Sequence, residues 1–287
     1  TRSFHVTGVQ TCALPIYTDI LTWSPPCVSF SSSNKSWKAD KWLWILLIEA
    51  YLRIVLVKKY NGKLKYWLME NVSNSSKFVK DKYTAEELGL PEKYWVLEIP
   101  NGAHLLASDY GAPQNRKRYV CGDFPMPEKT HEWNEVLIEN VLLRLWKPFT
   151  WERKSKIKDP VYGFEIDSLK LTDHYYDTRV SEHDWKKARR LKEDHGFMGK
   201  MDFPERVNRT SRTVMATQSA STREAIIFGA EKDDNWEYIS YRLPTIREIA
   251  TFMWFPINYL FQWTNEWNKY RLVWNAVCPP LSWALAW

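Results

Sequence analysis

The stretch YTDILTWSPPC, residues 17–27, decides the fold class of this 287-residue chain. It predicts a short β-strand that runs into a loop stiffened by two prolines. Residues 43–57 form an apolar run that predicts a helix, and residues 64–72 predict another strand. Residues 118–121 predict a further strand, with one more ahead of residue 108. Strands that alternate with helices indicate an α/β fold with a parallel or mixed sheet, whose site lies at the carboxyl ends of the strands.

Composition divides the chain into four parts. Residues 1–16 are similar to translated sequencing-adapter sequence, so we expect them not to be native, and residues 17–144 hold the predicted sheet. Residues 145–235 are rich in Lys, Arg, Asp and hydroxyl side chains with few periodic apolar runs, which predicts a smaller, irregular domain. Residues 236–287 return to compact structure, because RLPTIREIATFM has a helical period that starts near Pro244 and Thr245.

Several functional classes are disfavoured by simple features. The apolar run is interrupted by Glu49 and Arg53, so it does not meet the criterion for a membrane span and we expect no membrane association. The four cysteines lack paired zinc-ligand spacing and disulfide density, which favours a reducing compartment without a metal site. A net charge of +6 suits a polyanionic partner but does not require one.

Three short stretches carry candidate chemistry. Cys27 follows Ser-Pro-Pro, which holds its thiol in a stiff loop, although a buried structural cysteine is the common alternative. Glu70 places a carboxylate among apolar neighbours at a strand end, whereas a capping or solvated Glu would be commoner. Gln114, Arg116 and Arg118 share one face of an extended segment, which could also be an exposed basic edge strand.

Five short motifs, taken in order, resemble the motif series of the cytosine-C5 DNA methyltransferases. They are SPPC, ENV, QNRKR, RLPTIRE with a following FP, and NAVCPPL. The resemblance covers residues 17–125 and 240–287. It implies a Rossmann-like sheet that uses S-adenosylmethionine and is incomplete at its amino terminus. Residues 145–235 match the target-recognition domain of the family.

The resemblance also implies roles for individual residues. Cys27 matches the nucleophile that adds to C6 of a cytosine flipped out of the duplex, and Glu70 matches the acid that holds N3. Arg116 and Arg118 match the arginines that grip the base and order the catalytic loop. The implied cofactor residues are Pro26, Leu46, Asn275, Ala276 and Val277, and the expected DNA contacts are Gln114, Arg212 and Arg223.

Elementary chemistry supports these roles. C5 of cytosine is a poor nucleophile until a thiolate adds to C6 with a proton donor nearby. The target carbon lies inside the base stack, so the base has to be flipped out at a cost of about a few kcal/mol. The basic runs RKSKIK (153–158) and KKARRLK (186–192) are candidates for phosphate contacts, or are solvated helix faces. Residues 211–224, rich in small hydroxyl side chains, are candidates for base contacts.

The function implied is that of a DNA (cytosine-5-)-methyltransferase with double-stranded DNA as partner. We expect a cytoplasmic prokaryotic monomer, in a restriction-modification system with an endonuclease for the same site, or a solitary methylase. A related transfer-RNA cytosine methyltransferase is the alternative enzyme, against which the length of residues 145–235 argues. A non-catalytic DNA-binding remnant is the alternative from another class.

Two departures from the family pattern concern glycine. No glycine-rich cofactor loop precedes Tyr17, so we expect the first three strands and most of the adenosine site to be missing. Trp254, Trp274 and Trp42 or Trp44 stand where the family has Gly, in a chain with 17 Trp and 10 Gly. A UGA codon that encodes glycine but was read as tryptophan would explain this, whereas a tryptophan-rich lineage is the alternative. We expect these positions to lie in tight turns or close backbone approaches.

Overall fold

The computed structural model describes residues 18–26, 30, 41–62, 64–133, 135–145, 155–159, 163–171, 178–194, 199–216, 219–262 and 265–286. The chain forms two compact units. Unit 1 comprises residues 1–105 and 117–126, and unit 2 comprises residues 106–116 and 127–287.

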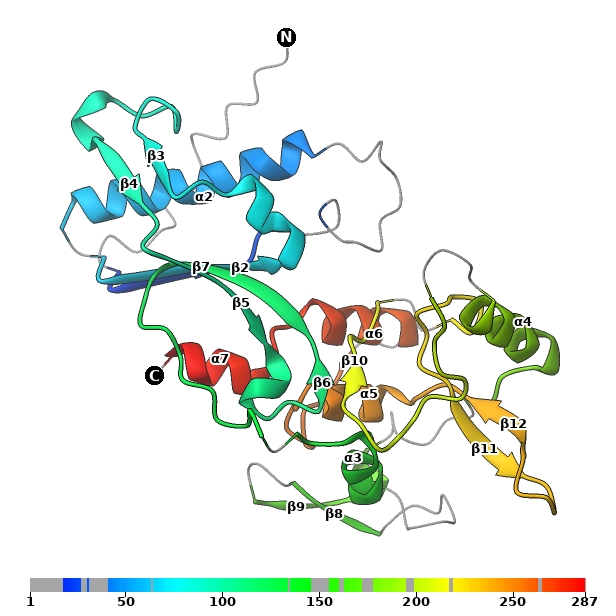
Figure 1. Cartoon of the computed structure of the whole chain (residues 1–287). Helices are drawn as coiled ribbons and strands as arrows, with labels where there is room; N and C mark the ends of the chain where they lie inside the picture. Colours follow the sequence, from blue (N-terminus) through cyan, green and yellow to red (C-terminus); the bar gives the residue numbers. More distant parts are fainter. Residues whose placement is uncertain are drawn as a thin grey trace. The chain divides into compact units, whose positions relative to one another are not determined.

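Unit 1 is built on a mixed four-stranded sheet (Figure 1). Its strands are ordered β1 (Ile20–Trp23), β2 (Tyr66–Val72), β7 (Lys117–Asp123) and β5 (Asn101–Leu106). β1 runs parallel to β2, and β7 runs antiparallel to β2. The α/β class and all four strands predicted from the sequence are therefore confirmed. The remaining elements of unit 1 are η2 (Ser73–Phe78), β3 (Lys82–Thr84), η3 (Glu92–Tyr94) and β4 (Val96–Glu98).

Helix α2 (Trp42–Tyr60) is the predicted apolar helix, and it packs on this sheet. Ile48, Leu52 and Val55 recur at helical spacing and are almost completely buried in a core that includes Trp67 of β2. The buried hydroxyl of Tyr51 lies 3.1 Å from the carbonyl oxygen of Leu21 and 2.7 Å from that of Leu68. One residue of the helix thus fastens β1 and β2 together.

Gly122 permits the close pairing of β2 with β7. It lies opposite Leu68 with a φ of +150°, a conformation that L side chains rarely adopt. A Cβ atom at this position would lie 2.1 Å from the carbonyl oxygen of Trp67, which is far inside van der Waals contact. No other residue fits here without displacement of the strand that carries Glu70.

Unit 2 contains short strands and five helices among its described residues. Its carboxyl-terminal part begins with α5 (Ile246–Phe252), which has a capping box formed by Thr245 and Glu248. Arg242 donates two hydrogen bonds of 2.8 Å to the buried carboxylate of Glu248. The motif RLPTIRE is therefore a helix start closed by a bidentate ion pair. The other elements are η4 (Ala107–Tyr110), β6 (Gln114–Asn115), α3 (Ile138–Leu145), β8 (Lys156–Lys158), β9 (Glu165–Asp167), η5 (Ser168–Lys170), α4 (Glu182–Glu193), β10 (Ser211–Arg212), β11 (Phe228–Lys232), β12 (Tyr238–Arg242), α6 (Glu266–Asn275) and α7 (Pro279–Ala286).

The compact units differ from the expected boundaries at residues 145 and 235. Helix α5 packs against both α3 and α6, and α7 contacts η4. These contacts place residues 236–287 in one unit with the irregular region instead of with the sheet of unit 1. Sequence composition does not reveal this grouping, because it depends on which apolar faces meet. Residues 1–17 lie outside the described part of the chain.

Three tryptophans have left-handed backbone conformations. Among the described non-glycine residues, positive φ occurs only at Trp95 (φ 63°), Trp236 (φ 64°) and Trp254 (φ 65°). Trp254 confirms the expected turn, whereas Trp95 and Trp236 were not anticipated. The expected tight turn is not found at Trp42 and Trp44, which lie in α2, or at Trp274, which lies in α6. A close approach of these positions to the cofactor stays a prediction. A helical residue needs no positive φ, so these three positions give no backbone argument for glycine.

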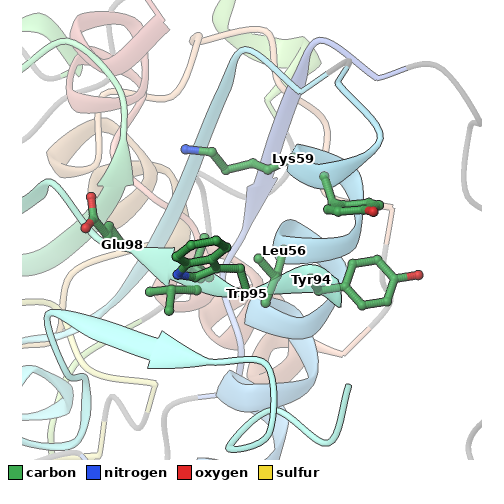
Figure 2. A pocket seen from close by; sticks show the side chains of 8 residues that line it. Leu56, Lys59, Tyr94, Trp95 and Glu98 are labelled. Carbon is green, nitrogen blue, oxygen red and sulfur yellow. The ribbon is translucent and has the colours of Figure 1, made fainter. Parts of the chain in front are cut away.

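Trp95 also lines a hollow on unit 1. The hollow has a volume of about 350 Å³ and lies between the end of α2 and β4 (Figure 2). Leu56, Lys59 and Tyr94 contribute to the same wall. The indole of Trp95 is nevertheless 79% exposed, so it contributes little to the core.

None of the helices in the described part of the chain has the length and apolar character needed to cross a bilayer.

Candidate active site

The parallel register of β1 and β2 brings Ser24 to Glu70. Trp23 pairs with Met69, so the next residue of each strand follows side by side. The hydroxyl of Ser24 donates a hydrogen bond of 2.6 Å to Oε2 of Glu70. Glu70 is 6% exposed, whereas Ser24 is exposed. The carboxylate thus lies at the carboxyl end of its strand, where the sequence predicted it.

Arg118 holds the other oxygen of the same carboxylate. The antiparallel register places Arg118 opposite Val72, diagonally across from Glu70. Its Nε lies 3.0 Å from Oε1 of Glu70, and both side chains are buried. Nη1 of Arg118 also donates to the carbonyl oxygen of Lys117, at 2.8 Å. The two predicted residues Glu70 and Arg118 therefore form one buried ion pair, which fixes the orientation of the carboxyl group.

Asn71 ties the proline loop to β2. Its side-chain amide donates a hydrogen bond of 3.1 Å to the carbonyl oxygen of Pro25, which is buried. Oδ1 of Asn71 accepts a hydrogen bond of 2.8 Å from the backbone N–H of Val72, which fixes the amide orientation. Cys27, the predicted nucleophile, lies outside the described residues. The structure thus fixes the start of its loop.

Arg116 belongs to unit 2 and has a different environment from Arg118. Its Nη2 donates to the carbonyl oxygens of Trp274, at 2.5 Å, and Ala276, at 3.0 Å. A guanidinium at these carbonyls satisfies acceptors at the end of α6 and complements the helix dipole. These contacts lie within unit 2, whereas Glu70 belongs to unit 1. A direct role of Arg116 at the base remains a prediction.

The expected cofactor residues fall in both units. Pro26 follows β1 and Leu46 lies on α2, and both are exposed in unit 1. Asn275 ends α6, and the N–H of Ala276 donates to the carbonyl oxygen of Val273. Exposed apolar side chains suit the face of an adenine ring, and Pro26 lies just beyond the carboxyl end of β1. The chemistry of Pro26 and Leu46 therefore fits this part of S-adenosylmethionine, while a joint site with residues 275–277 stays a prediction.

The expected DNA contacts are engaged inside unit 2. Gln114 is fully buried, and its Oε1 accepts a hydrogen bond of 3.4 Å from the N–H of Val214. The side chain is therefore not the exposed contact that the sequence predicted, and the strand that carries it, β6, pairs with β10. Arg212 forms an ion pair with the buried Glu205. Arg223 donates a hydrogen bond of 2.7 Å to the carbonyl oxygen of Gly199. Contact of any of these three with DNA remains a prediction.

Helix α4 carries the exposed part of the second basic run. Ser181 caps the helix by accepting a hydrogen bond from the N–H of Asp184. Lys186, Lys187 and Arg190 are exposed, while Ala188 is buried against the neighbouring core. These residues therefore form a positively charged helix face. Such a face is expected both if it contacts DNA phosphates and if it is only solvated.

Lys192, at the end of the same run, points inward instead. Its Nζ donates to the carbonyl oxygens of Arg223, at 2.9 Å, and Ala225, at 2.6 Å. Burial lowers the pKa of Lys192 to about 7, and the nearby Arg212 acts in the same direction. This lysine is therefore unsuited to contact phosphate from its position in the structure.

Two other cysteines are poor nucleophiles. Burial raises the pKa of the Cys121 thiol to about 12, so it stays protonated. Cys278 is also buried, with its Sγ 3.5 Å from Sδ of Met253. The chemistry expected of Cys27 is therefore not duplicated at Cys121 or Cys278.

Sequence reasoning did not assign roles to Ser24 and Asn71. Both lie inside the quoted motifs, but the contact of Ser24 with Glu70 follows only from the strand register. A polar residue directly after one parallel strand, with a carboxylate two residues before the end of its neighbour, is the signal that could have indicated this pair.

Comparison with known proteins shows which family the chain resembles. A family model described as C-5 cytosine-specific DNA methylase matches residues 4–286, a range that includes part of the expected non-native leader. Whether residues 1–16 are native stays a prediction. The type II methyltransferase M.AquIA of Picosynechococcus is 33% identical over 129 residues, which cover 41% of this chain and 50% of that protein. M2.ScrFI of Lactococcus lactis subsp. cremoris is 33% identical over 141 residues, which cover 43% of this chain and 36% of that protein.

The chain thus spans about half or less of the curated relatives that it matches. Among solved structures, one described as a DNA modification methyltransferase encoded within an E. coli prophage has a TM-score of 0.51 at 18% identity. The alignment covers 93% of this chain and 77% of that one. This likeness concerns the fold alone.

Proposed function

Because the chain belongs to the C-5 cytosine-specific DNA methylase family, we propose that the whole protein methylates C5 of cytosine in DNA. The observation that carries the proposal is the buried carboxyl group of Glu70, held by Arg118 and Ser24 beside the loop that leads to Cys27. A fixed carboxyl group next to a cysteine loop is what addition to a cytosine ring needs.

The reaction starts with the Cys27 thiolate, which adds to C6 of the base. Glu70, in its protonated form, donates a proton to N3 and so receives the charge that the addition places on the ring. The added electron pair makes C5 nucleophilic, and S-adenosylmethionine supplies the methyl group when bound. Solvent then takes up the C5 proton, and the electron pair of that C–H bond forms the C5–C6 double bond as the C6–S bond breaks and releases the thiolate. N3 returns its proton to Glu70, which restores the aromatic ring. Arg118 keeps the carboxyl group aimed throughout, because its Nε holds Oε1.

In the proposed mechanism, the target cytosine reaches this site by flipping out of the DNA duplex. C6 of a paired cytosine is covered by its stacked neighbours, and N3 is occupied by the pairing guanine, so neither is accessible in the duplex. The exposed lysines and arginine of α4 supply phosphate contacts in this proposal. Arg212 and Arg223 would read bases if their present partners, Glu205 and the carbonyl oxygen of Gly199, were exchanged for DNA.

The biological setting proposed is modification in a restriction-modification system, with an endonuclease for the same site as partner. The printed names of the two curated relatives, both type II methyltransferases, support this setting. A transfer-RNA cytosine methyltransferase would use the same Glu70 and Cys27 chemistry, so the substrate has to be tested directly.

Covalent trapping tests the chemistry. The protein from its complete gene should form an adduct with duplex DNA that carries 5-fluorocytosine, because fluorine cannot leave as the C5 proton does. Cys27→Ser should abolish the adduct, while Cys121→Ser and Cys278→Ser should retain it in proportion to their folded fraction. An adduct that persists in Cys27→Ser would refute the nucleophile, and trapping of transfer RNA instead of duplex DNA would identify the alternative enzyme.

A further inference from the structure

The two oxygens of the Glu70 carboxylate have partners of different chemistry. Oε1 faces the guanidinium Nε of Arg118 at 3.0 Å. Oε2 accepts the hydroxyl hydrogen of Ser24 at 2.6 Å, which is a short, charge-assisted hydrogen bond. Both contacts lie within unit 1 and follow from strand pairing on either side of β2.

Only one of these partners can exchange a proton with the carboxylate. A guanidinium cannot be deprotonated in proteins, so Arg118 orients Glu70 and cannot supply it with a proton. A serine hydroxyl has one donor hydrogen and two acceptor lone pairs. It can therefore pass its own proton to Oε2 while it accepts another from water.

The burial pattern places Ser24 on the route to solvent. Glu70 is 6% exposed and Arg118 is 8% exposed, whereas Ser24 is exposed at the end of β1. The hydroxyl stays in register because the next residue, Pro25, is tied to Asn71 of β2. Ser24 thus links a buried carboxylate to bulk water in a fixed geometry.

We propose that Ser24 is a positioning residue that orients Oε2 of Glu70 and relays protons to it from solvent. The inference rests on the proposed function, in which Glu70 has to carry a proton before it donates one to N3. In the relay, the Oγ–H bond of Ser24 breaks as the Oε2–H bond forms, and Oγ takes a proton from hydronium. Carboxylate and hydronium are thereby converted into carboxylic acid and water, and Ser24 is unchanged.

The contact itself is tested on this chain without any substrate. Protein labelled with 13C at the Glu carboxyl carbon gives a Glu70 signal that is assigned by its loss in Glu70→Gln. Ser24→Ala should shift this signal and Ser24→Thr should restore it. Ser76→Ala is the matched control, because the Ser76 hydroxyl donates to the carbonyl oxygen of Ser73 instead. A signal that does not move in Ser24→Ala overturns the inference.

The relay is tested by exchange of the C5 hydrogen. The protein from the complete gene, incubated with duplex DNA that carries [5-³H]cytosine, should release tritium to water through addition at C6. We expect Ser24→Ala to slow release by about 100-fold, the lower end of the range for general acid catalysis, and to change its solvent isotope effect. Ser24→Thr should restore both, and binding of the duplex should be unchanged.

The outcomes separate the two proposals. If Cys27→Ser and Glu70→Gln release tritium as the unmodified protein does, the proposed function fails. If both abolish release while Ser24→Ala leaves rate and isotope effect unchanged, the relay alone is overturned. If the unmodified protein releases none, the 13C signal decides whether Ser24 holds the carboxylate.

Discussion

Replacing Trp95 by Gly should stabilise the protein, although the change removes a whole indole side chain. Trp95 ends η3 with φ 63° and ψ −107°, a combination that is strained for any residue with a Cβ. Its indole is 79% exposed at the rim of the hollow beside α2 (Figure 2), so little buried surface is lost. The backbone therefore dominates the balance at this position.

The magnitude follows from two opposing terms. Relief of a strained backbone contributes about 1–3 kcal/mol. The greater freedom of Gly in the unfolded chain costs about 0.4–1 kcal/mol. The net expectation is a gain of about 0.5–2 kcal/mol, which for a chain of this size raises Tm by a few degrees.

Urea unfolding followed by far-ultraviolet circular dichroism measures the change. Trp95→Ala is the matched control, because it removes the same indole but keeps the Cβ and hence the strain. Trp95→Gly should exceed Trp95→Ala in unfolding midpoint, whereas Trp67→Gly should lose about 3–5 kcal/mol, since Trp67 is buried. A Gly variant no more stable than the Ala variant would refute the strain argument. The left-handed backbone at Trp95 would then no longer favour a UGA glycine codon read as tryptophan at this position.

Three further perturbations test unit 2. Arg116→Met should cost about 1–3 kcal/mol, because the carbonyl oxygens at the end of α6 lose their donor, and an unchanged urea midpoint would contradict this. Charge reversal at Lys187 and Arg190 should weaken binding to all DNA sequences alike and lower the salt slope by about 2, whereas an unaltered slope would exclude this face from the interface. Because burial lowers the pKa of Lys192 from 10.5 to about 7, the unfolded chain binds more protons between these values, so stability should rise with pH across that window. Lys192→Met should remove this rise, and urea midpoints from pH 6 to 10 that stay parallel in the two proteins would contradict it.

The strands and the long helix were predictable because each depends on local apolar patterning. The strand-end position of Glu70 was predictable for the same reason, whereas its ion pair with Arg118 follows from the antiparallel register of β2 and β7. The roles of both residues at the base stay predictions. The contact between Ser24 and Glu70 was not predictable, because the register of β1 against β2 is set by distant packing. Periodicity put Arg116 on the same face as Arg118, but the chain passes from one unit to the other between them.

The burial of particular polar side chains could not be predicted from the sequence pattern either. Gln114 looks exposed in a basic run, yet its side chain is buried and accepts a hydrogen bond from Val214, about a hundred residues further along the sequence. Likewise, left-handed backbone at Trp95 and Trp236 depends on the turn that each completes, which the surrounding letters do not specify.

Tyr51 lies in the middle of a helix and has no part in the chemistry, yet its hydroxyl spans the carbonyl oxygens of Leu21 and Leu68. Those two strands carry Ser24 and Glu70 at their ends. A genetic selection for lost methylation should therefore return alleles at Tyr51 alongside alleles of the reacting groups, and second-site suppressors of such alleles should map to the β1–β2 seam. Sorting variants by distance from the catalytic carboxyl group would misclassify this position as neutral.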